Sequence, residues 1–260
     1  MFETNPFSAL FDTISPTVMQ AFVLSMIALV VAGTLFDLAH KKSARYFFEN
    51  ARRNRGTRTI GTAEKVSLVL KTALVDWLAA GEFCNSQRRI AHLLTMYGFL
   101  AYIVATVAMV FGHPETADDT PVIWPLLWHL GALLVFIGGC WFWLLQRVDV
   151  AAEGRSRFRV VRADLFILAL LANVTAALIW SYLLSDGRGG WSNIALGLYL
   201  TSAMILFGSV PWSKFSHMFY KPAAAFQKRV EDANGSRANL PLPVDAPATL
   251  GSARTPPANY

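Results

Sequence analysis

The sequence predicts an all-α protein that is embedded in a membrane through five transmembrane helices. Apolar residues make up 54% of the chain and charged residues only 15%, which is below the quarter that is usual in soluble domains. Five apolar runs are each long enough to cross a hydrocarbon core of about 30 Å, which takes roughly 20 residues in a helix. Helices are the expected form because lipid offers no partner for exposed backbone amides.

The apolar runs divide the chain into a membrane domain with two flanking segments. Residues 1–17 form an outer segment that is expected to lie partly on the membrane through Phe2, Phe7, Leu10 and Phe11. Residues 18–230 form the membrane domain, and residues 231–260 form a tail rich in Pro, Ala, Asn and Ser that is expected to be disordered. The expected spans are Gln20–Ala39, Leu93–Gly112, Ile123–Leu145, Leu165–Leu184 and Trp191–Val210.

The long connection between the first two spans, residues 41–91, contains an amphipathic helix of its own. From Ala63 to Trp77, apolar residues recur at helical spacing, namely Val66, Val69, Leu70, Ala73, Leu74 and Trp77. This pattern predicts a helix that lies either on the membrane surface or under a partner protein.

The basic residues predict the orientation. Every Lys and Arg except Arg188 lies in residues 41–91, in residues 147–162 or after Trp212. Because basic loops stay on the cytoplasmic side, the N-terminus is expected outside and the C-terminus in the cytoplasm of a bacterial or archaeal cell, with the chain in the cytoplasmic membrane. This distribution explains the net charge of +6 without a nucleic-acid partner. The N-terminus lacks the pattern of a secretory signal peptide.

Two histidines are expected to face each other from different helices. His92 begins the second span after Arg88 and Arg89, and His217 follows the fifth span after Lys214. A helix continuous from Trp191 to His217 would cover roughly 40 Å, so both histidines would reach the cytoplasmic boundary. Two imidazoles can ligate one haem b, and the three basic side chains suit its propionates. The alternative is two interfacial histidines that bind nothing.

Three motifs carry a resemblance to a known family. They are Asp76-Trp77, the stretch Arg88-Arg89-x-x-His92-x-x-x-x-Tyr97-Gly98-Phe99, and the stretch from Pro211-Trp212-Ser213-Lys214 through His217 to Tyr220. From about Gln20 to Arg229 the chain resembles the nitrate reductase gamma subunit-like cytochrome b family. Within it, the chain looks most like the membrane part of quinone-interacting membrane-bound oxidoreductases or the membrane anchor of adenylylsulfate reductase.

The resemblance implies two haems, but two of the four ligand positions differ in this chain. Tyr102 and Tyr199 stand where the family would have the histidines of the outer haem. The chain is therefore interpreted as a one-haem variant with His92 and His217 as the remaining ligands. The two tyrosines are expected to fill the vacated space and to bond to each other or to groups such as Asn173. A second outer site built from His113 and His129 is less favoured, because His113 lies beyond the helix end.

The resemblance also implies an electron-transfer function. The chain would relay electrons between quinone and a cytoplasmic iron–sulfur or flavin enzyme of sulfur metabolism. The iron–sulfur clusters would sit on that partner, because Cys84 and Cys140 alone cannot supply four thiolates. A haem-free membrane anchor that tethers a redox enzyme is the alternative. A transporter is disfavoured because the helices show no paired halves or interrupted segments.

Two further predictions concern the quinone and the partner. A quinone site near the single haem would use Asp37, His40 and Arg89, whereas an outer site would use His129 as proton carrier. The inner site is preferred because it shortens the electron path. The basic residues expected to attract an acidic partner are Arg52, Arg53, Arg55, Arg58, Arg155, Arg157 and Arg159.

Overall fold

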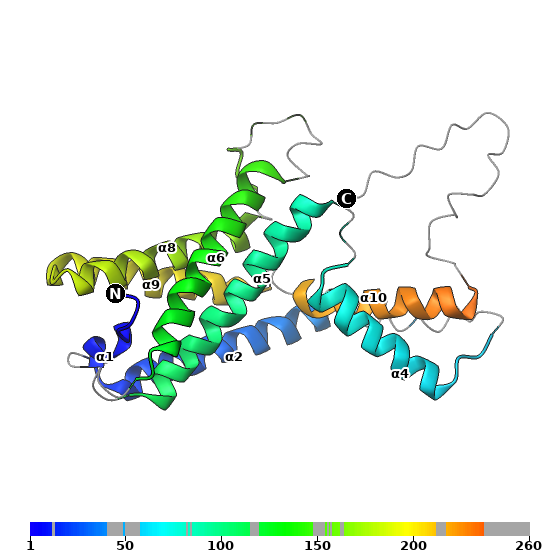
Figure 1. The fold of residues 1–260 in the computed structure, drawn as a ribbon, viewed down its shortest axis with the longest axis horizontal. Coiled ribbons are helices and arrows are strands. Elements are labelled where there is room, and N and C mark those ends of the chain that lie inside the picture. The colour runs from blue at the N-terminus through cyan, green and yellow to red at the C-terminus, as the bar shows by residue number, and fades with distance from the viewer. Residues whose placement is uncertain are drawn as a thin grey trace. The chain divides into compact units, whose positions relative to one another are not determined.

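The computed structural model describes residues 1–11, 14–40, 49, 58–81, 83, 85–114, 120–147, 154, 156, 158–161, 164–211 and 217–236. The regular elements in these ranges are all helical (Figure 1). The chain divides into two compact units. We call residues 1–37 and 86–216 the membrane unit, and residues 38–85 and 217–260 the small unit.

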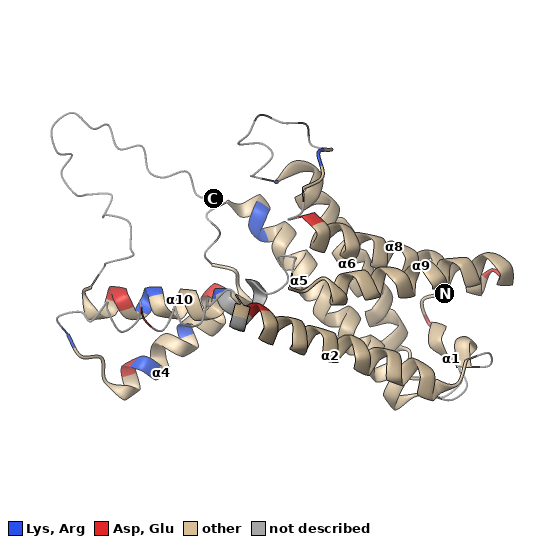
Figure 2. Ribbon diagram, turned by 180° about the vertical axis from the view of Figure 1, so that it is seen from behind, with Lys and Arg blue, Asp and Glu red and all other residues tan. Residues whose placement is uncertain are grey.

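All five predicted spans are confirmed, with ends that differ from the expected ones by a few residues. Each is long and apolar enough to cross a membrane, and the charged residues of the described helices gather on α4, on α10 and near the ends of the spans (Figure 2). The spans are α2 (Pro16–His40), α5 (Ser86–Val107) with its π-helical extension η2 (Ala108–Gly112), α6 (Ile123–Leu145), α8 (Leu165–Ser185) and α9 (Gly189–Gly208).

Two helix pairs form most of the membrane unit: α5 packs along α6, and α8 packs along α9, while α6 also contacts α8 (Figure 1). Glycines allow the close approach of α5 and α6. A Cβ atom on Gly131 would lie 2.7 Å from the carbonyl oxygen of Gly98, and one on Gly98 would lie 2.8 Å from that of Gly131. Small residues at such interfaces let helix backbones pack closely in lipid.

Gly138 and Gly139 serve the same purpose further along α6. A Cβ atom on Gly138 would lie 2.8 Å from the carbonyl oxygen of Ala91, and one on Gly139 would lie 2.9 Å from Leu171 of α8. The two glycines therefore pack α6 against both neighbouring helices.

The amino-terminal segment packs into the membrane unit. Its short helix α1 (Pro6–Phe11) buries Phe7 completely, and Leu10 is 8% exposed. The prediction that both side chains lie on the membrane is therefore wrong, because both join the protein core instead. We call this end of the membrane unit, predicted to be the outer one, the α1 end.

The fifth span ends well before His217. Helix α9 stops at Gly208, turn residues follow to Pro211, and His217 begins a separate helix, α10 (His217–Asn234). The assumption of one helix continuous to His217 is thus wrong. Pro211 supplies a physical reason, since the residue before a proline is disfavoured in helical conformation.

The small unit contains the predicted amphipathic helix, which is confirmed as α4 (Thr62–Lys71) followed by the π-helix η1 (Thr72–Leu78). Both contact α10. The guanidinium group of Arg229 on α10 donates two hydrogen bonds to Asp76, one of them 2.8 Å long. Helix α10 extends through Asn234, so the expected disorder does not begin at Glu231, which is 3% exposed. The rest of the tail lies outside the described residues.

Candidate functional site

The first turns of α5 carry the predicted haem ligand His92 together with both arginines. His92 and Arg88 are half-buried, whereas Arg89 is exposed. Because residues four apart share a helix face, the Arg88 guanidinium and the His92 imidazole project from the same side of α5. Asp37, near the end of α2, is only 2% exposed, and His40 at the last position of that helix is exposed.

The second predicted ligand is described only by its backbone. His217 is the first residue of α10, while its side chain and the whole of Lys214 lie outside the described residues. His92 belongs to the membrane unit and His217 to the small unit. The pairing of the two imidazoles on one iron therefore stays a prediction.

The two tyrosines predicted to fill the space of an outer haem lie in a buried polar cluster. Tyr102 of α5 is 2% exposed and Tyr199 of α9 is 5% exposed. The Tyr102 hydroxyl donates to Oδ1 of Asn173 on α8 over 3.3 Å, and Nδ2 of Asn173 donates to the Tyr199 carbonyl oxygen over 3.0 Å. Asn173 also donates to the hydroxyl of Ser202. The predicted hydrogen bond to Asn173 is confirmed for the Tyr102 hydroxyl, whereas Tyr199 contacts Asn173 through its backbone carbonyl. Together these bonds join three helices.

Aromatic rings fill the space around this cluster. The Tyr102 ring stacks on Trp128, with 5.3 Å between centroids, and the Tyr199 ring stacks on Trp180, with 5.7 Å between centroids. Phe7 of α1 contacts both tryptophans edge to face, and all three rings are almost inaccessible to solvent. The Trp128 indole N–H donates to the hydroxyl of Thr106. The α1 end of the membrane unit is therefore a packed core of aromatic rings.

His129 lies in the same region with both ring nitrogens engaged. Nδ1 is 2.7 Å from the Pro125 carbonyl oxygen, and Nε2 is 2.7 Å from the hydroxyl oxygen of Ser181. A carbonyl only accepts hydrogen bonds, so Nδ1 carries a proton and donates it to Pro125. Since the imidazole is also completely buried, its contacts with Pro125 and Ser181 form a bridge between α6 and α8.

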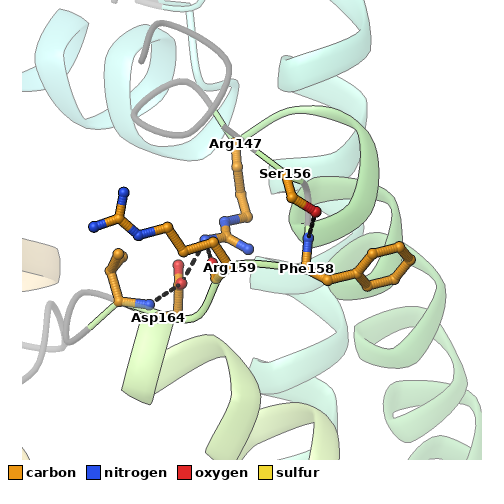
Figure 3. A network of polar contacts seen from close by, with 6 residues as sticks. Arg147, Ser156, Phe158, Arg159 and Asp164 are labelled. Atoms are coloured by element: carbon orange, nitrogen blue, oxygen red, sulfur yellow. Dashed lines mark hydrogen bonds and ion pairs between the residues drawn. The ribbon is translucent and has the colours of Figure 1, made fainter. Parts of the chain in front are cut away.

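A buried ion pair at the opposite end of the membrane unit was not predicted from the sequence. Nη2 of Arg147, the second residue after α6, lies 2.6 Å from Oδ2 of Asp164, directly before α8, and donates to the Arg159 carbonyl oxygen (Figure 3). Asp164 also accepts from the backbone N–H of Val161. The signal available in the sequence was an arginine at the end of one span and an aspartate at the start of the next.

The arrangement allows different chemistry at the two ends of the membrane unit. The α1 end offers the buried side chains of Tyr102, Tyr199 and His129, in space already filled by tryptophan and phenylalanine rings. The opposite end offers the half-buried imidazole of His92 with a guanidinium group on the same helix face. Among the described residues, no group of three or more His, Cys, Asp or Glu side chains is placed to hold a metal ion.

Comparison with known proteins gives one distant similarity. Over 171 residues the chain is 26% identical to citrate utilization protein B of Escherichia coli. The aligned region covers 62% of this chain and 44% of that protein. The chain thus spans less than half the length of the curated relative that it matches. No family model matches the chain, and no solved structure matches it.

Proposed function

We propose that this protein is a membrane cytochrome b-type subunit that relays electrons between the quinone pool and a cytoplasmic iron–sulfur or flavin enzyme. The observation that carries the proposal is the placement of His92 and Arg88 on one half-buried face at the start of a transmembrane helix. When bound, haem b would supply a one-electron iron couple. His92 and His217 would ligate the iron, and Arg88, Arg89 and Lys214 would pair with the propionates.

The donor set fits one haem and not two. At the α1 end, neither Tyr102 nor Tyr199 offers an imidazole, and Trp128, Trp180 and Phe7 occupy the surrounding space. Elsewhere in the sequence, His92 and His217 each follow basic residues. This difference supports a stoichiometry of one haem per chain.

The test is a reduced-minus-oxidised optical spectrum of the purified protein, with the haem quantified by extraction. We expect one low-spin haem b, which is lost in both His92→Ala and His217→Ala because each variant removes an axial ligand. His113→Ala is the matched control, since His113 is a half-buried histidine at the end of η2, and it should keep the haem. Full haem content in both ligand variants would contradict the assignment.

A haem-free anchor that tethers a redox enzyme is the second candidate. It is favoured by the replacement of two expected ligands by Tyr102 and Tyr199. The same spectrum separates the candidates, because the anchor would show no haem absorption in the wild-type protein while still retaining its partner during purification.

Two similarities suggest different classes of partner enzyme. The motif resemblance points to adenylylsulfate reductase or a related enzyme of sulfur metabolism. The name of citrate utilization protein B associates that protein with the use of citrate, which makes an oxidoreductase of organic-acid metabolism the other candidate. Purification of the tagged chain from its native membrane, followed by mass spectrometry of what co-purifies, distinguishes the two classes.

The quinone is proposed to react near Asp37, His40 and Arg89, at the end of the chain's first span and the start of its second. Asp37 is a buried carboxyl and His40 is exposed, so the two could pass protons between the quinone and water. We expect Asp37→Asn and His40→Ala to slow haem reduction by quinol, and His129→Ala to leave its rate unchanged. Slowing by the His129 change alone, with the other two silent, would place the quinone at the α1 end instead.

A further inference from the structure

The helix formed by α4 and η1 packs against α10 through the less apolar of its two sides. Glu64, Leu68, Thr72 and Asp76 follow one another at four-residue intervals and therefore share a face. Asp76 forms the ion pair with Arg229 of α10, and Thr72 is 4% exposed. Leu68 on the same face is half-buried. This packing leaves the opposite side of the helix free for other contacts.

That opposite side carries an exposed row of apolar side chains, which we call the apolar stripe. A helix in a water-soluble domain normally turns its apolar face toward the core, so the packing in the small unit is reversed. Contiguous exposed apolar surface of this kind marks an interaction site. The members of the stripe and their exposed fractions are Val66 at 53%, Val69 at 50%, Leu70 at 56%, Leu74 at 59% and Trp77 at 48%.

We propose that the apolar stripe inserts into the lipid bilayer at the boundary between headgroups and acyl chains. Lys65 and Lys71 are exposed, and helical geometry places them beyond opposite edges of the stripe. Lysines in such positions extend their ammonium groups to lipid phosphates while their stems stay in the apolar layer. Trp77 at the end of the stripe is the residue type that is enriched at membrane–water interfaces.

Continuity of the chain supports lipid over a protein partner. Helix η1 ends at Leu78, and the transmembrane helix α5 begins at Ser86. The intervening residues span at most roughly 30 Å when fully extended. The α4–η1 helix is therefore tethered within reach of the membrane surface, where an amphipathic helix typically buries its apolar face about 5–10 Å deep.

The experiment measures the depth of single spin labels on the full-length protein in nanodiscs that contain phosphatidylglycerol. Cys84→Ser and Cys140→Ala remove the native thiols. Labels are then placed through Leu70→Cys and Leu74→Cys on the stripe. Ala224→Cys is the matched control, because Ala224 is exposed on the face of α10 that also exposes Lys221 and Lys228. For each label, the rate of collision with oxygen, which concentrates in lipid, is compared with the rate of collision with a water-soluble nickel chelate.

We expect both stripe labels to collide mainly with oxygen and the Ala224 label to collide mainly with the nickel chelate, so that the ratio of the two rates inverts. Similar access of the nickel chelate to Leu70 and Ala224 would overturn the proposal. Shielding of both stripe labels from both reagents would also overturn it, since it would mean that protein and not lipid covers the stripe. The outcome does not depend on haem, so it stands apart from the proposed function.

Discussion

At the scale of single residues, buried polar side chains at the α1 end are satisfied by one another. Asn173 accepts a hydrogen bond from the Tyr102 hydroxyl and donates one to the Tyr199 carbonyl oxygen, while His129 bridges Pro125 and Ser181. In a membrane, a buried polar group without such a partner is costly because no water is available. The cluster therefore acts as a set of interhelical hydrogen bonds that holds α5, α6, α8 and α9 in register.

The Tyr102→Phe variant tests whether these interhelical hydrogen bonds stabilise the helix bundle. It removes the donor to Oδ1 of Asn173 and should lower the free energy of unfolding by about 1 kcal/mol, the usual scale for a hydrogen bond between membrane helices. The measurement is denaturant-induced unfolding in detergent micelles. Tyr182→Phe is the control, since Tyr182 is 54% exposed, and it should have little effect. If the space around Tyr102 held a haem instead, the Phe variant would also change the haem content, which we expect to stay constant.

At the scale of helices, pairs are held by close backbone approach along their length and by a buried ion pair at one end. Gly98 and Gly131 face each other between α5 and α6. Arg147 and Asp164 join the end of α6 to the start of α8, with side chains only 6% and 9% exposed. The close backbone approach requires residues without side chains, and the ion pair requires both charged groups.

The Gly131→Leu variant should force α5 and α6 apart, because even a Cβ atom there would lie 2.7 Å from the Gly98 carbonyl oxygen. Overpacking of this kind typically costs about 1–3 kcal/mol. Gly197→Leu provides a control of identical size change, since a Cβ atom on Gly197 meets nothing within 4 Å. Equal unfolding midpoints for the two variants would show that the close approach does not contribute to stability.

The Arg147→Gln variant should leave the Asp164 carboxylate buried without its counter-charge. Removal of one member of a buried ion pair typically costs about 3–5 kcal/mol. Arg188→Gln is the matched control, because Arg188 and Asp186 form an ion pair whose side chains are 61% and 40% exposed, and exposed pairs contribute little. If the Arg147→Gln and Arg188→Gln variants lost similar amounts of thermal stability, the buried ion pair would contribute no more to stability than the exposed one, contrary to this prediction.

At the scale of the whole molecule, the basic residues lie almost entirely on one side of the predicted topology. Of the arginines expected to attract a partner, Arg58 and Arg159 are exposed, and Arg58 pairs with Glu64. Arg52, Arg53, Arg55, Arg155 and Arg157 lie outside the described residues. The positive-inside rule accounts for such a distribution, so a role in docking has to be detected through rates.

The association rate of the proposed redox partner with the chain in nanodiscs should fall as salt concentration rises, because salt screens long-range attraction. Replacement of Arg58 and Arg159 by Gln should lower the rate at low salt and flatten its salt dependence. The Arg188→Gln variant, changed at the other side of the predicted topology, is the control. A rate that is independent of salt would count against electrostatic docking.

The sequence by itself determined the fold class and the positions of all five spans, because a helix must satisfy its own backbone and an apolar run of sufficient length has no other stable form in lipid. The amphipathic helix near Val66 and the meeting of Tyr102 with Asn173 were also predicted, the first from periodicity and the second from the cost of a buried hydroxyl.

Only the tertiary structure decided where the apolar surfaces point. Phe7 and the α4–η1 stripe are both apolar, yet Phe7 is buried between two tryptophans while the stripe is exposed. Hydrophobicity is non-directional and does not name a partner, so pattern alone could not distinguish core from surface. The pairing of Arg147 with Asp164 likewise depends on contacts between elements, which residue spacing within one element does not contain.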